Sequence, residues 1–185
     1  MQTLLDFAVI LLALFVVGQF VWAMRFHFRT EKMALAAKMI SAIGMATIAL
    51  FIYLLAAREQ PVLAHLAGIG LMIGASLLFV AAISASRAAR LYYVFEGRGP
   101  NSLLTDGPYR YLRHPFYVSY LALWCGWALA TWTWVSIIPV AIIGAVYVKA
   151  AQDEEATIAA SPLAGDYAAY KRRAGFFWPR LGGFS

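Results

Sequence analysis

Long apolar runs alternate with short polar stretches along the chain. Three runs in the first half, residues 3–24, 39–57 and 62–86, contain few charged side chains. A helix needs about 20 apolar residues to cross the hydrocarbon core of a membrane. The pattern therefore predicts three membrane-spanning helices before residue 87.

A fourth apolar run, residues 116–148, is too long for one span and too short for two full spans with a loop. Trp132 and Trp134 lie near its middle, each preceded by a threonine. Because tryptophan favours the membrane–water interface, we expect a tight helical hairpin that turns at residues 131–134. Pro139 would lie in the first turns of the second arm. This gives five spans, the last two of them short.

The basic residues orient these spans. Of the 15 Lys and Arg residues, all except Arg58 fall on one side of a five-span arrangement. Lys and Arg are enriched on the cytoplasmic side of membranes. We therefore expect a multi-pass protein of a membrane such as the bacterial inner membrane, with the N-terminus outside and the C-terminus in the cytoplasm.

The composition agrees with a membrane protein. The 185 residues are 63% hydrophobic and 13% charged, with a mean hydropathy of +0.71. A soluble domain is about half apolar and about a quarter charged, so a soluble domain, a disordered chain and a disulfide scaffold are excluded. Membrane anchoring explains the net charge of +6, and no nucleic-acid partner is expected. We predict one all-α membrane domain, with three N-terminal spans in residues 1–86 and the chemically active half in residues 87–185.

Polar residues gather in residues 104–117. The Asp-Gly-Pro sequence of residues 106–108 predicts a turn. Pro115 predicts the start of the fourth span, because proline is favoured in a first helical turn. Arg113 and His114 would then lie at a helix N-terminus, which favours an anion. Alternatively, the arginines are membrane anchors and the tyrosines form an interfacial belt.

A second polar stretch, residues 153–173, begins with Asp-Glu-Glu. Acidic residues contribute little to topology. Glu154 and Glu155 therefore either face a ligand held by the first stretch or belong to a mixed-charge surface helix. Tyr167 and Tyr170 are three positions apart, so they share one face of a predicted helix, where packing is the alternative to ligand binding.

Three other features have structural explanations. Gly70 and Gly74 form a GxxxG pattern that is typical of close helix packing, and the same pattern leaves both a monomer and a homodimer open. His27 and His65 are single histidines near span ends, where we expect interfacial positions. No Cys/His cluster has metal-ligand spacing, so no metal is expected.

The longest motif is GPYRYLRHPFY, residues 107–117. The predicted hairpin, the Glu154–Glu155 pair, a Tyr-x-x-Tyr pair and Pro179 follow it. This order of motifs, over residues 91–179, resembles the isoprenylcysteine carboxyl methyltransferase family and the related phospholipid methyltransferases. Gly175 stands where that family often has arginine. The resemblance implies an integral membrane methyltransferase that uses S-adenosylmethionine, releases S-adenosylhomocysteine and binds the cofactor between the cytoplasmic motif loop and a C-terminal helix.

The resemblance also implies roles for individual residues. The residues expected to contact the cofactor are Leu104, Tyr109, His114, Pro115, Tyr117, Glu154 and Glu155. The residues expected in catalysis are Arg113, Glu155 and Arg173, and those expected to bind the substrate are Arg110, Tyr167, Tyr170 and Arg172. The side-chain chemistry also suits a zwitterionic cofactor with an adenine, because it offers basic groups for a carboxylate, acidic groups for an amine or ribose and tyrosines for the base.

The expected acceptor is a lipophilic small molecule or a membrane lipid that enters from the bilayer. A carboxylate acceptor needs no general base, whereas an amine or a hydroxyl does, with Glu155 or His114 as the candidate. Two other functions stay open. One is an NADPH-dependent membrane reductase of the sterol-reductase type, whose members show a similar RHPxY-like pattern. The other is a non-enzymatic scaffold subunit.

Overall fold

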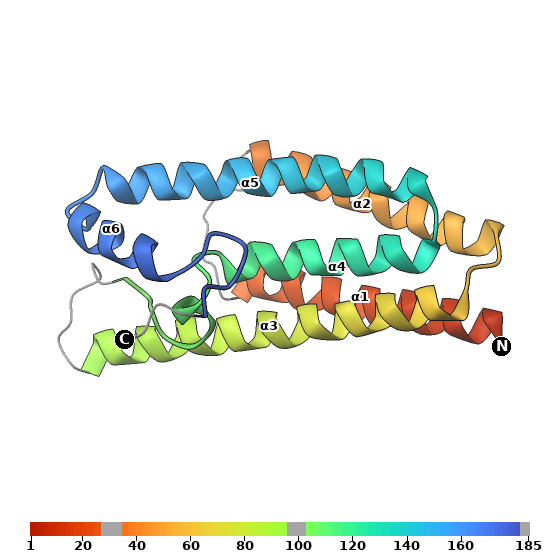
Figure 1. Cartoon of the computed structure of the whole chain (residues 1–185), viewed down its shortest axis with the longest axis horizontal. Coiled ribbons are helices and arrows are strands. Elements are labelled where there is room, and N and C mark those ends of the chain that lie inside the picture. The colour runs from red at the N-terminus through yellow and green to blue at the C-terminus, as the bar shows by residue number, and fades with distance from the viewer. Residues whose placement is uncertain (27–34, 96–102, 182–185) are drawn as a thin grey trace. The chain divides into compact units, whose positions relative to one another are not determined.

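The computed structural model describes residues 1–26, 35–95 and 103–181. These residues contain six α-helices and two short 3-10 helices (Figure 1). The elements are α1 (Gln2–Phe26), α2 (Leu35–Ala57), α3 (Val62–Phe95), η1 (Gly107–Arg110), α4 (Pro115–Thr131), η2 (Trp134–Ser136), α5 (Ile137–Ala159) and α6 (Ala164–Arg173). Within the described chain, the one extended pairing is an isolated bridge between Leu112 and Gly175. The predicted all-α class is therefore confirmed.

Four of the described helices are long and apolar enough to cross a membrane, namely α1, α2, α3 and α5. Helix α4 has 17 residues and is shorter than these four. The structure thus describes a multi-pass membrane protein with four candidate spans rather than the predicted five. The third candidate span, Val62–Arg87, agrees with the predicted residues 62–86, and helix α3 itself continues to Phe95.

The predicted hairpin is confirmed in its position. Helix α4 ends at Thr131 and α5 begins at Ile137, so the turn lies at the paired tryptophans. Trp132 has a positive φ of 48°, which is the left-handed conformation that often ends a helix. The Ser136 hydroxyl donates to the carbonyl oxygen of Thr133 at 2.6 Å and to that of Ala128 at 3.2 Å. These bonds tie the turn to the end of α4.

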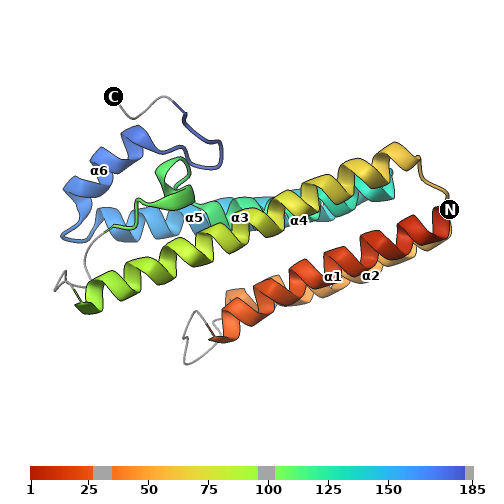
Figure 2. The same ribbon diagram turned by 90° about the horizontal axis from the view of Figure 1, so that it is seen from below.

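The chain divides into two compact units, which are described separately. Unit 1 contains residues 1–76 and 120–146, and unit 2 contains residues 77–119 and 147–185. In unit 1, α1 and α2 run antiparallel (Figures 1 and 2). The buried core of unit 1 includes Phe51, whose ring meets that of Trp127 edge-to-face at 5.8 Å.

Two glycines allow α3 and α4 to approach closely in unit 1. A Cβ atom placed on Gly68 would lie 2.5 Å from the carbonyl oxygen of Gly126, and one on Gly126 would lie 2.8 Å from that of Gly68. Added Cβ atoms on Gly70 and Gly74 would meet nothing within 4 Å among the described residues. Among the described residues, the close helix packing predicted for this group of small residues is therefore made by Gly68, beside the GxxxG pair, and not by Gly70 or Gly74.

His65 lies near the start of α3, close to a span end as predicted. It is fully buried and lies 2.7 Å from Asp6 of α1, measured from Nε2 to Oδ1. His27 lies outside the described residues.

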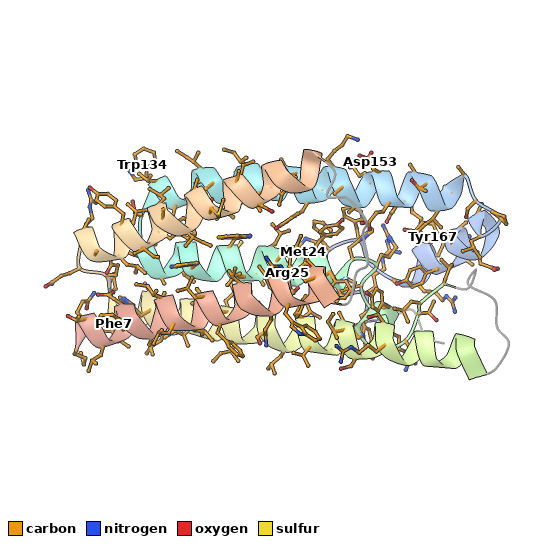
Figure 3. The ribbon with its side chains drawn as sticks, turned by 180° about the vertical axis from the view of Figure 1, so that it is seen from behind. Phe7, Met24, Arg25, Trp134, Asp153 and Tyr167 are labelled. Carbon is orange, nitrogen blue, oxygen red and sulfur yellow. The ribbon has the colours of Figure 1, made fainter. Side chains whose placement is uncertain are left out.

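Unit 2 holds both polar stretches. Pro115 begins α4 as predicted, and the amide of Val118 donates to the His114 carbonyl oxygen at 3.1 Å. The chain turns after α5 and continues into α6; Figure 3 labels Asp153 and Tyr167 on these two helices. Tyr167 and Tyr170 lie on the buried face of α6, with their ring centroids 6.0 Å apart, so the predicted shared face is confirmed.

Candidate functional site

The motif loop is paired with the chain segment that follows α6. The Gly175 amide donates to the Tyr111 carbonyl oxygen at 2.9 Å, and the Arg113 amide donates to the Gly175 carbonyl oxygen at 2.8 Å. A Cβ atom on residue 175 would lie 1.7 Å from the Trp178 carbonyl oxygen. Only glycine fits this tight turn, which brings the C-terminal segment against the motif.

Glu155 contacts three basic side chains in unit 2. Its Oε1 accepts from Arg113 Nε at 2.7 Å and lies 3.2 Å from His114 Nε2. Its Oε2 lies 2.7 Å from Lys171 Nζ. The Glu155 side chain is 11% exposed. Both carboxylate oxygens are thus already bound by basic side chains from the motif loop and from α6.

Arg113 is occupied in the same way. Its side chain is 10% exposed. Besides Glu155, its Nη1 donates to the carbonyl oxygen of Ala174 at 2.6 Å, just after α6. The guanidinium carbon also lies 5.4 Å from the ring centroid of Phe176. Arg113 therefore joins α5, the end of α6 and the C-terminal segment to the motif loop.

Glu154 is the accessible member of the acidic pair. Its side chain is 55% exposed. Its Oε1 accepts from the Tyr117 hydroxyl at 2.5 Å, and its Oε2 lies 3.6 Å from His114 Nδ1. The His114 imidazole is buried and lies between the two glutamates. The site therefore presents an exposed carboxylate whose two oxygens are positioned by the Tyr117 phenol and the His114 imidazole.

Aromatic rings surround His114. The ring centroids of Phe176, Tyr117 and Phe177 lie 5.0, 5.9 and 6.1 Å from that of His114. Tyr147 of α5 lies 5.5 Å from Tyr117. Aromatic faces attract cations and planar rings. An exposed carboxylate next to several aromatic rings suits a ligand that is cationic at one end and aromatic at another.

The tyrosines of α6 act within the protein. The Tyr170 hydroxyl donates to the Tyr109 carbonyl oxygen at 2.7 Å, which attaches α6 to η1. Burial raises the pKa of Tyr170 above its usual range. Burial also raises the pKa of Tyr167, with a further contribution from the negative charge of Glu155. Both phenols stay protonated at neutral pH, so Tyr170 keeps its donor bond.

Several predicted residues lie apart from the Glu154–His114 cluster. Arg110 and Arg173 line a pocket of about 250 Å³ together with Tyr170 and the turn before η1. Arg172 is exposed, and Leu104 is half-buried in the loop before that turn. The structure thus brings His114, Tyr117, Glu154, Glu155 and Arg113 together, whereas Arg110 and Arg173 form a second, separate group.

The sequence-based prediction missed three contributors. These are Phe176, Phe177 and Arg180. Arg180 Nη1 donates to the Arg172 carbonyl oxygen at 2.8 Å and so caps the C-terminus of α6. The Phe-Phe pair, separated from a basic run by two residues, is a weak sequence signal for a group of aromatic side chains. Lys171 belongs to the basic run of residues 171–173, which the sequence places near the site, but its pairing with Glu155 depends on the fold.

The phospholipid methyltransferase family model matches residues 63–161, which is more than half of the chain. The chain belongs to the phospholipid methyltransferase family. This match covers α3, η1, α4 and α5 and thus contains the motif loop and both glutamates. No match was found among curated proteins or among solved structures.

Family membership establishes the general chemistry. The protein is a membrane methyltransferase that uses S-adenosylmethionine and acts on a lipid-type acceptor. The residues found in unit 2 suit this cofactor, because the exposed Glu154 carboxylate complements its ammonium group and the aromatic rings complement its adenine and sulfonium. No group of three metal-ligating side chains occurs in the described parts of the chain.

Proposed function

We propose that this enzyme transfers a methyl group from S-adenosylmethionine to a lipophilic acceptor at the cytoplasmic end of unit 2. The observation that carries the proposal is the difference in burial and bonding between Glu154 and Glu155. Glu155 is held by three basic side chains, whereas Glu154 is exposed beside Tyr117 and His114. The buried residue shapes the site, and the exposed residue is available to a ligand.

Cofactor binding is assigned to the residues around Glu154. Glu154 would accept hydrogen bonds from the ammonium or ribose of the cofactor, and Tyr117 and His114 would hold that carboxylate in place. The N-terminus of α4, which starts at Pro115, is the positive end of the helix dipole and favours the cofactor carboxylate. Tyr109 and Leu104 would complete the surroundings from the motif loop.

The remaining predicted residues support the site or face the acceptor. Glu155 and Arg113 would act by positioning the motif loop, since their polar atoms are used within the protein. Tyr167 and Tyr170 would position α6. The separate pocket with Arg110 and Arg173 would receive an anionic part of the acceptor, with Arg172 beside it on α6.

The chemical demand on these residues is mainly alignment. The bound cofactor supplies a methyl group on a positively charged sulfur, which is displaced in line by the acceptor. Holding the reactants in that geometry accounts for a large share of the rate. A carboxylate acceptor needs no base. An amine or hydroxyl acceptor must lose a proton to a base, for which His114, between the two glutamates, is the candidate.

The proposal includes a five-span topology in which α4 also crosses the membrane. Seventeen residues extend about 26 Å along a helix, which is slightly less than a hydrocarbon core of about 30 Å. The tight turn between α4 and α5 supports a hairpin. With five spans, the N-terminus is outside, and the motif loop and α6 meet the soluble cofactor in the cytoplasm.

The test begins with binding by the purified full chain. Calorimetry with S-adenosylhomocysteine should show one site, whereas NADPH should not bind. Glu154→Gln and Tyr117→Phe should weaken binding at least tenfold, which corresponds to the loss of about 1.4 kcal/mol. Asp153→Asn is the matched control, because Asp153 is a neighbouring exposed acid that pairs with Lys149.

Transfer is then measured with labelled S-adenosylmethionine and a membrane lipid extract. We expect label in one lipid fraction, and mass analysis identifies the acceptor as a carboxylate, an amine or a thiol. A purified, folded chain that binds neither S-adenosylmethionine nor S-adenosylhomocysteine would overturn the proposal.

A further inference from the structure

A second polar cluster lies in unit 1 and takes no part in the proposed methyl transfer. His65 Nε2 lies 2.7 Å from Asp6 Oδ1, and His65 Nδ1 lies 3.3 Å from the Pro61 carbonyl oxygen. Gln2 Nε2 donates to the Gln60 carbonyl oxygen at 2.7 Å. His65 and Gln60 are buried. These bonds fix the start of α1 to the α2–α3 loop and to the first turn of α3.

A cavity of about 560 Å³ opens between the start of α1 and the end of α2. Such a volume lies within the usual range for small-molecule sites. Its lining includes the charged residues Asp6, Arg58 and Glu59, of which Arg58 and Glu59 are exposed, and apolar residues such as Phe7 and Ile52. Figure 3 shows Phe7 near the end of α1 that lies away from Met24 and Arg25. The cavity lining therefore combines apolar residues with a charged group, Asp6, Arg58 and Glu59, which we call its entrance.

The charges at this entrance are incompletely paired. In the part of the chain that the structure describes, Arg58 and Glu59 have no ion-pair partner. Asp6 uses Oδ1 for His65, which leaves Oδ2 for a ligand. The entrance thus offers one guanidinium and two carboxylates. Arg58 is also the one basic residue that the five-span topology places on this side of the membrane.

We propose that this cavity binds the head group of a phospholipid that carries both a phosphate and an ammonium group. The phosphate pairs with Arg58, and the ammonium pairs with Glu59 and Asp6. The apolar wall takes the first carbons of an acyl chain. An anionic head group without an ammonium leaves the carboxylates unpaired and is disfavoured by like charge. The fixed geometry of Asp6 lowers the cost of ordering the site on binding.

The experiment uses the full chain in detergent and native mass spectrometry with added phosphatidylethanolamine or phosphatidylglycerol. We expect phosphatidylethanolamine to bind with at least several-fold higher affinity. Arg58→Gln and Glu59→Gln should each weaken its binding about tenfold, since each removes one charged contact. Arg25→Gln, which removes an exposed guanidinium at the other end of α1, is the matched control and should change nothing.

Equal binding of the two lipids, or unchanged binding by both Arg58→Gln and Glu59→Gln, would show that the bound lipid is only non-specific annular lipid. Either result would overturn the proposal. Thermal unfolding of each variant checks that the fold is kept. S-adenosylhomocysteine binding is measured in the same samples and should be unaffected by these two substitutions. Failure of lipid selectivity therefore leaves the assigned methyltransferase site untouched, and failure of cofactor binding leaves the lipid result standing.

Discussion

Glu154 and Glu155 are chemically identical neighbours with different environments. Successive residues on a helix point about 100° apart, so two adjacent glutamates near the end of α5 cannot face the same partners. Glu155 faces Arg113, His114 and Lys171, whereas Glu154 is exposed beside Tyr117. At the scale of single residues, the Glu155 carboxylate stabilises the fold through its basic partners, whereas the Glu154 carboxylate is accessible to a ligand.

Substitution of each glutamate should separate these roles. Glu155→Gln leaves the basic side chains around it without their counter-charge, and breaking a buried pair of this kind costs roughly 3 kcal/mol. Glu154→Gln should change the free energy of unfolding by less than about 0.5 kcal/mol, as exposed substitutions do, while weakening cofactor binding. Thermal unfolding and calorimetry measure the two effects. Equal destabilisation by the two variants would contradict the assignment.

Residue-scale prediction from the sequence succeeded where local rules decide. Pro115 begins α4 because proline suits a first helical turn, and this rule needs no knowledge of the fold. The partners of Glu155 depend on where the chain returns after α6. Lys171, which pairs with Glu155, lies 16 positions after it in the sequence. The Ala174 carbonyl, which accepts from Arg113, lies 61 positions after that arginine, and no spacing rule predicts either contact. For this reason the sequence indicated the motif residues but not which of them already have hydrogen-bond or ion-pair partners within the protein.

At the scale of elements, close backbone contacts between helices depend on particular glycines. Hydropathy placed the helices of this chain well, because burial in a membrane requires long apolar runs. Helix contacts were predicted less well, because the GxxxG spacing of Gly70 and Gly74 does not reveal which helix face meets a neighbour. Gly68, two positions earlier, makes the contact with Gly126.

Alanine substitutions in α3 test this contact. Gly68→Ala would place a Cβ atom 2.5 Å from the Gly126 carbonyl oxygen and 2.9 Å from the Ala130 Cβ. We expect a loss of about 1–3 kcal/mol in stability from overpacking. Gly70→Ala, in the same helix with nothing within 4 Å, should be neutral. Thermal unfolding in detergent compares them, and a stable Gly68→Ala variant would show that α3 and α4 do not pack in this way.

The C-terminal segment provides a similar test in unit 2. Gly175→Ala cannot keep the turn to Trp178, so it should release the pairing with Tyr111 and the cap that Arg180 forms on α6. Trypsin should then cleave within Lys171–Arg173 faster than in the parent protein, and cofactor binding should weaken. Gly165→Ala in α6 has open space around it and should resist trypsin as the parent does. Equal cleavage of the two variants would contradict the role of Gly175.

At the scale of the whole molecule, the charge distribution and the helix lengths both bear on the number of membrane spans. The distribution of Lys and Arg favours five spans, while α4 is shorter than the four helices that meet the length of a span. Whether the chain has four or five spans decides on which side of the membrane the site lies. If α4 crosses the membrane, residues after α5 are cytoplasmic; if it does not, they are outside, together with α6.

Cysteine labelling distinguishes these topologies. Trp134 in η2 and Ala160 after α5 are both exposed, and the native Cys125 can be replaced by alanine. In intact cells, an impermeant maleimide should label the W134C variant, and it should label the A160C variant only after the membrane is opened. If α4 did not cross, the two variants would exchange behaviour. The cofactor is a soluble cytoplasmic molecule. Glu154, six residues earlier in α5, can therefore act as proposed only if A160C is protected in intact cells.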